Sequence, residues 1–424
     1  MKTLIVGSGG REHAIAWALR RANPKLKIYC APGNAGIAEV AEGVHIGPEE
    51  QAALVQFAKT EAIDITVVGP EMPLADGLVD EFEARGLRIF GPSRAAARLE
   101  SSKSFAKEFM ARHGIPTAEY RVAGSAQQAL EVLRSGQFGA AETPVVVKTD
   151  GLAAGKGVVV AGSRAEAEKA IEDLASMLSV AEKPFLIEEM LVGPEASILI
   201  FADGRDYLLM PPARDHKRVG ENETGPNTGG MGSITDISIA DKKTLDRIRR
   251  EIVEPTLEAS SEEGFPFKGV LFLGLMLTTD GPRVLEYNVR FGDPETQAIL
   301  VRLNTDLLGI FQATVDQTLG NITADWVDGS SACVVLANRG YPGKYETGAI
   351  IKGLPEAVTD ESVQIFHAGT TKSKGGELLA TGGRVLGVTA PGITLDEALN
   401  RCYRAVDKIK WDGMQYRRDI GRFA

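Results

Sequence analysis

Short apolar runs alternate with amphipathic stretches through the first hundred residues, and this alternation most limits the possible folds. The predicted strands are 2–6, 27–30, 63–68 and 87–90, and the helical patterns between them are 12–21, 50–60 and 74–85. Strands that alternate with helices pack as a parallel sheet with helices on both faces. We therefore predict a doubly wound α/β domain, with its ligands at the carboxyl ends of the strands.

Three glycine-containing turns follow these strands, at residues 7–12, 32–36 and 69–71. The first is similar to a dinucleotide-binding fingerprint, but Glu12 stands where the third glycine belongs and no acidic residue ends the second strand. A glycine-rich turn that opens a helix still forms a site for one phosphate, to which Arg11 would add a mobile positive charge. We predict a single-phosphate site here; a turn built by glycines for geometry alone is the alternative.

The strongest candidate for chemistry is the polar stretch at 284–290. An apolar run and a Thr-Asp-Gly-Pro turn precede it within residues 270–282, so it is predicted to be the second strand of a hairpin. Alternation along a strand places Glu286, Asn288 and Arg290 on one face and Leu285, Tyr287 and Val289 on the other. Carboxylate and carboxamide oxygens suit Mg²⁺, and an arginine suits an anion. A solvated edge strand is the alternative.

A small α+β lobe is predicted over about residues 123–193, with a glycine-rich loop at 151–157 between two valine-rich strands. Lys148 ends the first of these strands, Lys156 lies in the loop, and Lys103 lies in a helical pattern predicted over 94–112. The loop is not a P-loop, because no Ser or Thr follows its Gly-Lys. Lysines and exposed backbone amides can nevertheless hold a triphosphate, although most isolated lysines are only solvated.

Two acids, Glu188 and Glu195, flank the segment Met-Leu-Val-Gly-Pro. The backbone of such a segment can hydrogen-bond an adenine edge, and an acid beyond it can accept hydrogen bonds from ribose hydroxyls. A charged strand end is the alternative. Further along, the flexible glycine-rich stretch 220–232 is predicted to be a functional lid, and His216 beside it is a candidate substrate contact.

Composition excludes several classes of protein. The chain has 424 residues, which suggests roughly three domains, and its net charge of −10 argues against nucleic acid as a partner. Its three cysteines make neither a disulfide framework nor a zinc ribbon and are expected to be small buried side chains. The apolar runs are too short for a membrane span, and the apolar start is too brief for a signal peptide. A cytoplasmic enzyme acting on small molecules is the expectation.

Taken in order, these blocks resemble the ATP-grasp superfamily and, more narrowly, the phosphoribosylamine–glycine ligase (glycinamide ribonucleotide synthetase) family. The similarity lies in the lysines and acids above and in the motifs at 9–13, 31–36, 215–232, 290–297, 367–370 and 382–386. The resemblance implies an N-terminal Rossmann-like substrate domain over 1–100, an ATP-grasp domain over 101–325 into which the small lobe is inserted, and a small β-rich α+β C-terminal domain over 326–424.

The resemblance also implies a reaction. Glycine would be joined to 5-phosphoribosylamine through glycyl phosphate, with ATP as a substrate and Mg²⁺ or Mn²⁺ as the metal, in the second step of de novo purine biosynthesis. The labile amine could be handed over by an upstream amidotransferase. Another ATP-grasp carboxylate–amine ligase, a nicotinamide-dependent oxidoreductase and a non-catalytic nucleotide sensor are the alternatives.

Site residues follow from the same resemblance. The catalytic residues would be Arg290 and Lys148, and the metal ligands Glu286 and Asn288. The ATP-binding residues would be Lys103, Lys148, Lys156, Glu188, Glu189, Leu191 and Glu195. The substrate-binding residues would be Gly9, Gly10, Arg11, Glu12, Gly33, Asn34, Asp215, His216, Lys217, Arg290 and Asp293. In one departure, the strand before Glu286 lacks the extra acid that many members of the superfamily carry.

Overall fold

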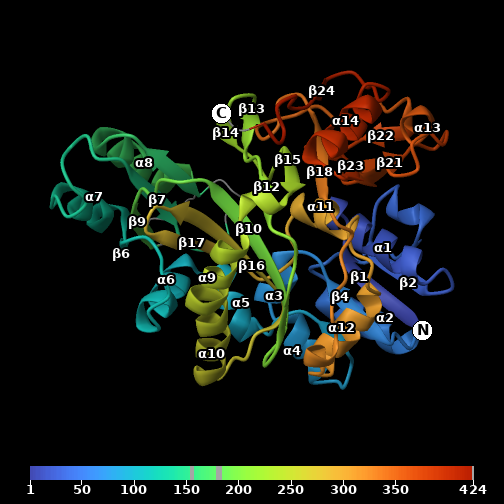
Figure 1. Cartoon of the computed structure of the whole chain (residues 1–424), viewed down its shortest axis with the longest axis horizontal. Helices are drawn as coiled ribbons and strands as arrows, with labels where there is room; N and C mark the ends of the chain where they lie inside the picture. The colour runs from blue at the N-terminus through green and yellow to red at the C-terminus, as the bar shows by residue number, and fades with distance from the viewer. Residues whose placement is uncertain (153–156, 178–183, 423–424) are drawn as a thin grey trace.

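The computed structural model describes residues 1–152, 157–177 and 184–422. The first hundred residues form a five-stranded parallel sheet of order β3-β2-β1-β4-β5, as the alternation predicts (Figure 1). Its strands are β1 (Lys2–Gly7), β2 (Lys27–Pro32), β3 (Glu42–Gly43), β4 (Ile65–Val68) and β5 (Ile89–Phe90), and its helices are α1 (Gly10–Ala22), α2 (Gln51–Thr60), α3 (Glu71–Ala75) and α4 (Leu78–Glu83).

Two predicted helices are each divided in two. The pattern at 74–85 forms α3 and α4, because Gly77 between them takes the left-handed φ of 90°. The pattern at 94–112 forms α5 (Arg94–Ser101) and α6 (Lys103–Arg112). Ser102 between them is extended, and its hydroxyl accepts a hydrogen bond from the backbone N–H of Phe105 at 3.2 Å. A serine that caps a new helix competes with continuation of the old one, and an amphipathic pattern does not reveal this competition.

The small lobe is a four-stranded antiparallel sheet of order β6-β9-β7-β8, which projects from the rest of the molecule (Figure 1). Its elements are β6 (Tyr120–Ala123), α7 (Ala126–Arg134), β7 (Val145–Thr149), β8 (Val158–Ala161), α8 (Arg164–Met177) and β9 (Phe185–Glu189). The lobe has an apolar core of its own, which includes Val147, Ile171 and Phe185. Most of the predicted glycine loop, residues 153–156, lies outside the described residues.

Among the described residues a 10-stranded sheet forms the body of the molecule, with the path β17-β16-β10-β12-β15-β18-β23-β20. Its strands are β10 (Glu195–Asp203), β11 (Tyr207–Leu209), β12 (Ala213–Asp215), β15 (Gly232–Thr235), β16 (Lys268–Thr278), β17 (Gly281–Asn288), β18 (Ser330–Asn338), β20 (Gln364–His367), β23 (Arg384–Gly392) and β24 (Met414–Gln415). The sheet continues across the domain boundary expected near residue 325, because β15 pairs with β18.

Helices and a second small sheet cover the body. The helices are α9 (Lys242–Ile248), α10 (Glu254–Glu262), α11 (Glu295–Leu300), α12 (Leu307–Val315), α13 (Leu354–Ala357) and α14 (Leu395–Val406). The C-terminal part also contains β19 (Ala349–Ile350), β21 (Thr370–Lys372) and β22 (Leu378–Ala380), in which β22 pairs with both β19 and β21. No helix in the described ranges is both long and apolar enough to span a membrane.

The predicted hairpin of β16 and β17 is confirmed, but it contains a β-bulge. Gly274 pairs with Glu286 and Leu275 pairs with Val284, so Leu285 is an extra residue in β17. Strict alternation places Leu285 on the buried face with Tyr287, and this prediction is wrong: Leu285 is half-buried, while Val284 is buried. A bulge adds one residue to one strand and shifts the side-chain alternation beyond it.

The stretch expected to be a flexible lid contains a hairpin of β13 (Arg218–Gly220) and β14 (Thr224–Asn227). Arg417 near the C-terminus is 1% exposed and anchors this hairpin. Its guanidinium donates to the carbonyl of Arg218 at 3.0 Å and to Glu223 at 2.6 Å, and Asp419 holds it from the other side. The stretch is therefore tied to a segment about two hundred residues away.

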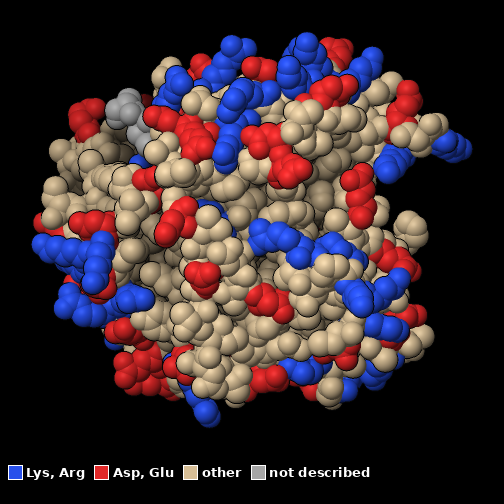
Figure 2. All heavy atoms as spheres, turned by 45° about the vertical axis from the view of Figure 1, so that its right-hand side comes forward, with Lys and Arg blue, Asp and Glu red and all other residues tan. Residues whose placement is uncertain are grey.

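Residues of the parallel sheet share their cores with the body of the molecule. The rings of Phe90 and Phe311 pack with centroids 4.4 Å apart, and Phe201 and Phe291 complete the cluster. The three cysteines are buried and unpaired, as expected of small core side chains. On the face shown in Figure 2, acidic and basic side chains are interspersed.

Candidate active site

The glycine turns of the first sheet close around Glu12. Its carboxylate accepts hydrogen bonds from the backbone N–H of Gly9 at 2.6 Å and from Nε of Arg11 at 2.7 Å. A Cβ added to Gly69 would lie 1.9 Å from its Oε1, so this carboxylate fills the space between the turns. Arg11 is buried and also donates to the carbonyl of Phe291 at 2.9 Å. The expectation of a mobile charge is therefore wrong, because Arg11 has fixed partners.

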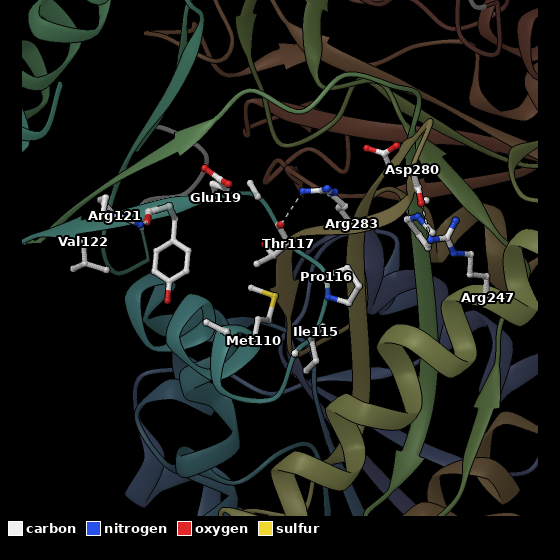
Figure 3. A pocket seen from close by; sticks show the side chains of 16 residues that line it. Met110, Ile115, Pro116, Thr117, Glu119, Arg121, Val122, Arg247, Asp280 and Arg283 are labelled. Carbon is white, nitrogen blue, oxygen red and sulfur yellow. Dashed lines mark hydrogen bonds between the residues drawn. The ribbon is translucent and has the colours of Figure 1, made fainter. Parts of the chain in front are cut away.

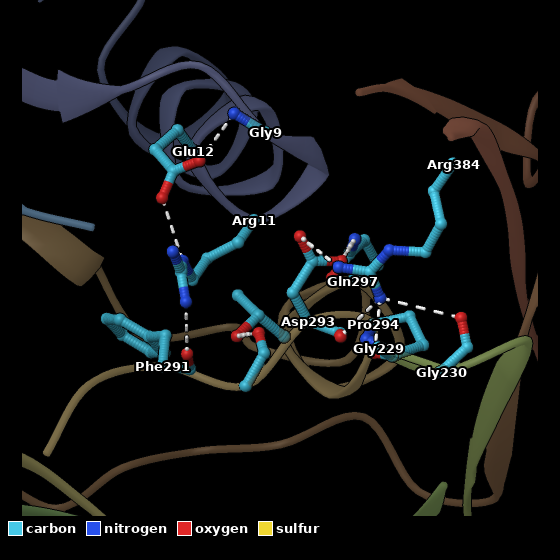
Figure 4. A network of polar contacts seen from close by, with 12 residues as sticks. Gly9, Arg11, Glu12, Gly229, Gly230, Phe291, Asp293, Pro294, Gln297 and Arg384 are labelled. Carbon is cyan, nitrogen blue, oxygen red and sulfur yellow. Dashed lines mark hydrogen bonds and ion pairs between the residues drawn. The ribbon is translucent and has the colours of Figure 1, made fainter. Parts of the chain in front are cut away.

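Asp293 lies where the first domain, the body and the C-terminal part meet (Figure 4). Its carboxylate accepts from Gln297 at 2.8 Å and lies 3.3 Å from the guanidinium of Arg384. Arg384 also donates to the carbonyl oxygens of Asp293 and Gly229, which ties the glycine-rich stretch to this corner. Burial raises the pKa of Asp293, but the charges of Arg384 and Arg11 outweigh it and hold that pKa below its ordinary value.

Other predicted substrate contacts line the same junction. An added Cβ at Gly10 would lie 2.6 Å from Nε2 of Gln297, so the helix start approaches α11 closely. Gly33 takes a left-handed φ of 78°. Asn34 donates to the carbonyl oxygens of Ser8 and His367, each at 2.8 Å, and its own oxygen accepts from two backbone N–H groups. In this structure Asn34 therefore holds the turn together.

Lys148, Glu188 and Lys107 form a buried cluster between the small lobe and the body. Nζ of Lys148 lies 3.0 Å from both carboxylate oxygens of Glu188 and 3.2 Å from the carbonyl of Leu285. Lys107, on α6, also pairs with Glu188 at 3.0 Å. Sequence reasoning missed Lys107, because a lysine inside an amphipathic helix looks solvated.

The remaining predicted ATP-binding residues surround this cluster. Lys103 donates to the carbonyl of Gly151 at 2.7 Å, and burial lowers its pKa. Glu189 accepts from the backbone N–H of Glu119 at 2.9 Å. Leu191 is half-buried, and Glu195 is exposed and pairs with Lys217 at 3.1 Å. Lys156 lies outside the described residues.

Arg290 lies at the end of β17 within a group of carboxylates. Its guanidinium donates to Glu100 at 2.9 Å and to the Asn288 carboxamide oxygen at 3.1 Å, and its Nε lies 3.4 Å from Glu71. Burial alone would lower the pKa of Arg290, but the charges of Glu100 and Glu71 raise it above the ordinary value. Glu100 carried no sequence signal, because it stands 190 positions earlier in the chain.

Glu286 and Asn288 fit the ligand set of a hard divalent cation. Oε1 of Glu286 lies 4.0 Å from Nζ of Lys217, beyond hydrogen-bond distance. Burial raises the pKa of Glu286, but the charges of Lys217, Lys148 and Lys103 lower it by more than burial raises it, so the carboxylate stays anionic. In the described part of the chain no three His, Cys, Asp or Glu side chains gather as a metal cage. Two protein oxygens are typical of Mg²⁺ sites that take their other ligands from phosphates and water.

Asp215 and Lys217 point one way and His216 the other, as alternation along an extended chain requires. Oδ1 of Asp215 is buried without a hydrogen-bond partner, and burial and then the charge of Glu295 raise the Asp215 pKa well above its ordinary value. His216 accepts from the backbone N–H of Gly421 at 3.0 Å, and burial lowers its pKa to about 4. Its Nδ1 lies 3.3 Å from the carbonyl oxygen of Gly232, and its role as a substrate contact stays a prediction.

A cavity of about 870 Å³ opens beside the segment that joins α6 to β6 (Figure 3). Arg247 and Arg283 line it, and Arg283 donates to the carbonyl of Thr117 at 3.4 Å. The residues predicted from the sequence do not line this cavity. They lie around the buried cluster and the corner at Asp293.

Comparisons with known proteins match the chain over nearly its whole length. Three family models match: phosphoribosylglycinamide synthetase N domain over residues 1–100, its ATP-grasp (A) domain over 101–296 and its C domain over 331–423. A phosphoribosylamine–glycine ligase from Caldanaerobacter subterraneus is 48% identical over 99% of both chains. One from Brucella melitensis is 48% identical over 99% of this chain and 97% of its own length.

Solved structures show the same likeness. The crystal structure of phosphoribosylamine–glycine ligase from Thermotoga maritima has a TM-score of 0.83 and 34% identity, and the match covers 99% of this chain and 100% of that one. A biotin carboxylase domain from Hydrogenobacter thermophilus shares the fold at a TM-score of 0.72 and 15% identity, over 98% of this chain and 91% of that one. The nicotinamide-dependent alternative is excluded, because the chain belongs to the phosphoribosylamine–glycine ligase family, within the ATP-grasp ligases.

Proposed function

We propose that the chain joins glycine to 5-phosphoribosylamine at the expense of ATP, giving glycinamide ribonucleotide, ADP and phosphate. One observation carries the proposal: Lys103, Lys148, Glu286 and Arg290 gather where the small lobe meets the β16–β17 hairpin, and the charges of Lys217, Lys148, Lys103 and Arg290 together hold the Glu286 pKa low. A carboxylate beside several cations suits a metal-bound polyphosphate.

Two displacements make up the proposed reaction. A carboxylate oxygen of glycine attacks the γ-phosphorus of ATP, and the bond to the β,γ-bridging oxygen breaks to release ADP. The amine of phosphoribosylamine then attacks the carbonyl carbon of glycyl phosphate; the carbon–oxygen bond to phosphate breaks and the amine loses a proton. Lys148 and Arg290 would stabilise charge that develops on the transferred phosphoryl group, which can contribute several kcal/mol.

Glu286 and Asn288 would hold Mg²⁺ or Mn²⁺. The bound ion would neutralise part of the charge of the polyphosphate. The Glu286 carboxylate, kept anionic by its neighbours, is the stronger ligand of the two. Asn288 contributes a neutral oxygen, whose direction is set by the hydrogen bond from Arg290.

The remaining roles are assigned by position. We place nucleotide binding at Lys103, Lys148, Glu188, Glu189, Leu191 and Glu195, and also at Lys156, which the structure does not describe. We place glycine near Asp215, Lys217 and Arg290, where the buried Oδ1 of Asp215 has no hydrogen-bond partner and would accept from an ammonium group. Phosphoribosylamine would occupy the corner formed by Gly9, Gly10, Gly33 and Asp293.

Domains and cellular context are also proposals. We propose domain boundaries at 100/101 and 325/326, with the small lobe inserted in the middle domain. A cytoplasmic location, no role for nucleic acid, and delivery of the labile amine by an amidotransferase-class reaction remain predictions from the sequence.

Isotope transfer tests the proposed reaction directly. With glycine labelled by ¹⁸O in its carboxylate, one labelled oxygen should appear in the released phosphate, because that oxygen attacks the γ-phosphorus. ADP release should need both glycine and phosphoribosylamine, the latter formed in situ from ribose 5-phosphate and ammonia. Unlabelled phosphate, or equal turnover with other amino acids, would contradict the assignment.

A further inference from the structure

We infer that Lys107 is a positioning residue for nucleotide binding, which holds Glu188 so that Lys148 keeps its charge for the polyphosphate. The inference rests on the proposed function and adds a residue that neither the sequence motifs nor the resemblance includes. Lys107 is 2% exposed. Because a lysine is almost never buried unless it is paired, Lys107 should have a charged partner.

Lys107 has two partners of different kinds. Its Nζ lies 3.0 Å from Oε2 of Glu188, on strand β9 of the small lobe. It also donates to the hydroxyl of Thr117 at 2.7 Å, in the segment that joins α6 to β6. Glu188 in turn has Lys148 at 3.0 Å from each carboxylate oxygen. One carboxylate is therefore shared by two buried ammonium groups.

The cluster is closed through strand β17. The hydroxyl of Thr117 donates to the carbonyl of Val284 at 2.7 Å, and Lys148 donates to the carbonyl of Leu285 at 3.2 Å. Leu285 is the extra residue of the β-bulge, and a bulge disrupts the ladder locally and re-aims its groups. The contacts thus run as a ring from the lobe through α6 and β17 and back to Lys148.

The charges of the ring explain what Lys107 does. Two ammonium groups and one carboxylate leave a surplus positive charge at the lobe–body junction. Without Lys107, the carboxylate of Glu188 would pair with Lys148 alone and cancel its charge. Lys148 would then attract a nucleotide polyphosphate less strongly, because opposite charges in contact inside a protein neutralise each other at long range. The effect should appear in nucleotide affinity more than in the chemical step.

Binding of ADP with Mg²⁺ to the whole chain, measured by calorimetry, tests the inference. We expect Lys107→Met to raise the ADP dissociation constant about tenfold, the size of one weakened charge contact, and to raise the ATP KM with less change in kcat. Lys107→Arg keeps the charge and should restore most of the affinity. Arg112→Met is the matched control, since Arg112 lies on the same helix and pairs with Glu263 at 2.8 Å, but its side chain is 47% exposed.

The wild-type protein offers a second readout that needs no substitution. Burial lowers the pKa of Lys107 to about 8. The negative charges of Glu188 and, more weakly, Glu189 raise this pKa, and the positive charge of Lys148 lowers it. Lys107 therefore loses its proton as the pH rises through about 8, and ADP affinity should fall there. The terminal phosphate of ADP has already lost its proton below this range. In Lys107→Met this pH dependence should be absent.

The outcomes separate the two proposals. If the folded wild-type protein takes up no ADP, the proposed function fails. If it binds ADP and Lys107→Met binds it equally well, with the same pH dependence, the role of Lys107 is refuted. If Lys107→Met does not fold, a flat wild-type affinity between about pH 7 and about pH 9 refutes the role in the same way.

Discussion

Replacement of Arg290 by methionine should separate stability from catalysis, because Arg290 belongs to a buried charge cluster and to the proposed site. Its guanidinium donates to Glu100 at 2.9 Å and lies 3.4 Å from Glu71. Glu100 is buried, and its other oxygen accepts the backbone N–H of Val289 at 2.7 Å. Without Arg290 the Glu100 carboxylate would stay buried, with that N–H as its remaining hydrogen-bond donor among the described contacts.

The cost follows from the burial. Removal of one partner of a buried ion pair typically costs about 3–5 kcal/mol of unfolding free energy. We expect about 3 kcal/mol for Arg290→Met, because the Val289 N–H still stabilises the carboxylate. In Arg290→Met/Glu100→Gln the buried carboxylate is removed as well, and Glu71, whose side chain is 31% exposed, can turn to solvent, so all but about 1 kcal/mol should return. Both variants should lack ligase activity, since each lacks the proposed catalytic guanidinium.

The loss should also depend on pH. Burial raises the pKa of Glu100, and the charge of Arg290 opposes that rise. Without Arg290 the folded-state pKa should rise further above the unfolded value. A raised carboxyl pKa contributes stability that is full below the unfolded pKa, about 4.3, and is lost as the pH rises through the folded pKa. The deficit of Arg290→Met should therefore shrink as the pH is lowered from about 8 to about 5.

Urea denaturation followed by circular dichroism, at both pH values, measures these differences, and ADP release measures activity. If Arg290→Met equals the wild-type protein in stability at the higher pH, the ion-pair reasoning is wrong. It is equally wrong if the double variant is no more stable than the single one. A double variant with near-normal turnover would instead refute the catalytic assignment of Arg290.

Three further changes probe other parts of the molecule. Glu286→Gln removes the charged metal ligand and should lower kcat by about 100-fold or more, as measured by glycine-dependent ADP release; near-normal turnover would refute the metal assignment. Gly69→Ala places a Cβ 1.9 Å from Oε1 of Glu12 and should destabilise the turn by about 1–3 kcal/mol in urea denaturation. Arg417→Met leaves the carboxylate of Asp419 without its buried partner and should make the 218–227 hairpin more sensitive to limited proteolysis; unchanged cleavage would show that the C-terminal anchor is dispensable.

Local chemistry made much of this fold predictable. The parallel sheet could be predicted from the first hundred residues, because short apolar runs indicate buried strands and the helical patterns between them indicate crossover helices. The Thr-Asp-Gly-Pro turn determined the hairpin that carries Glu286 and Asn288, and strand alternation placed both on one face. Helix breaks at Gly77 and Ser102 were missed, since the amphipathic pattern continues across both the left-handed glycine and the capping serine.

Contacts between distant segments were decided by the tertiary structure. The partners of Arg290 and Lys148 come from residues 190 and 40 positions away, and Arg417 reaches back 199 positions to the 218–227 hairpin. Burial takes these charges out of water, so that each one needs a partner, and burial depends on which surfaces pack together. A sequence shows which side chains can carry a charge or bind a metal; only the packed chain determines which of them share a carboxylate, and so which charge remains for a substrate.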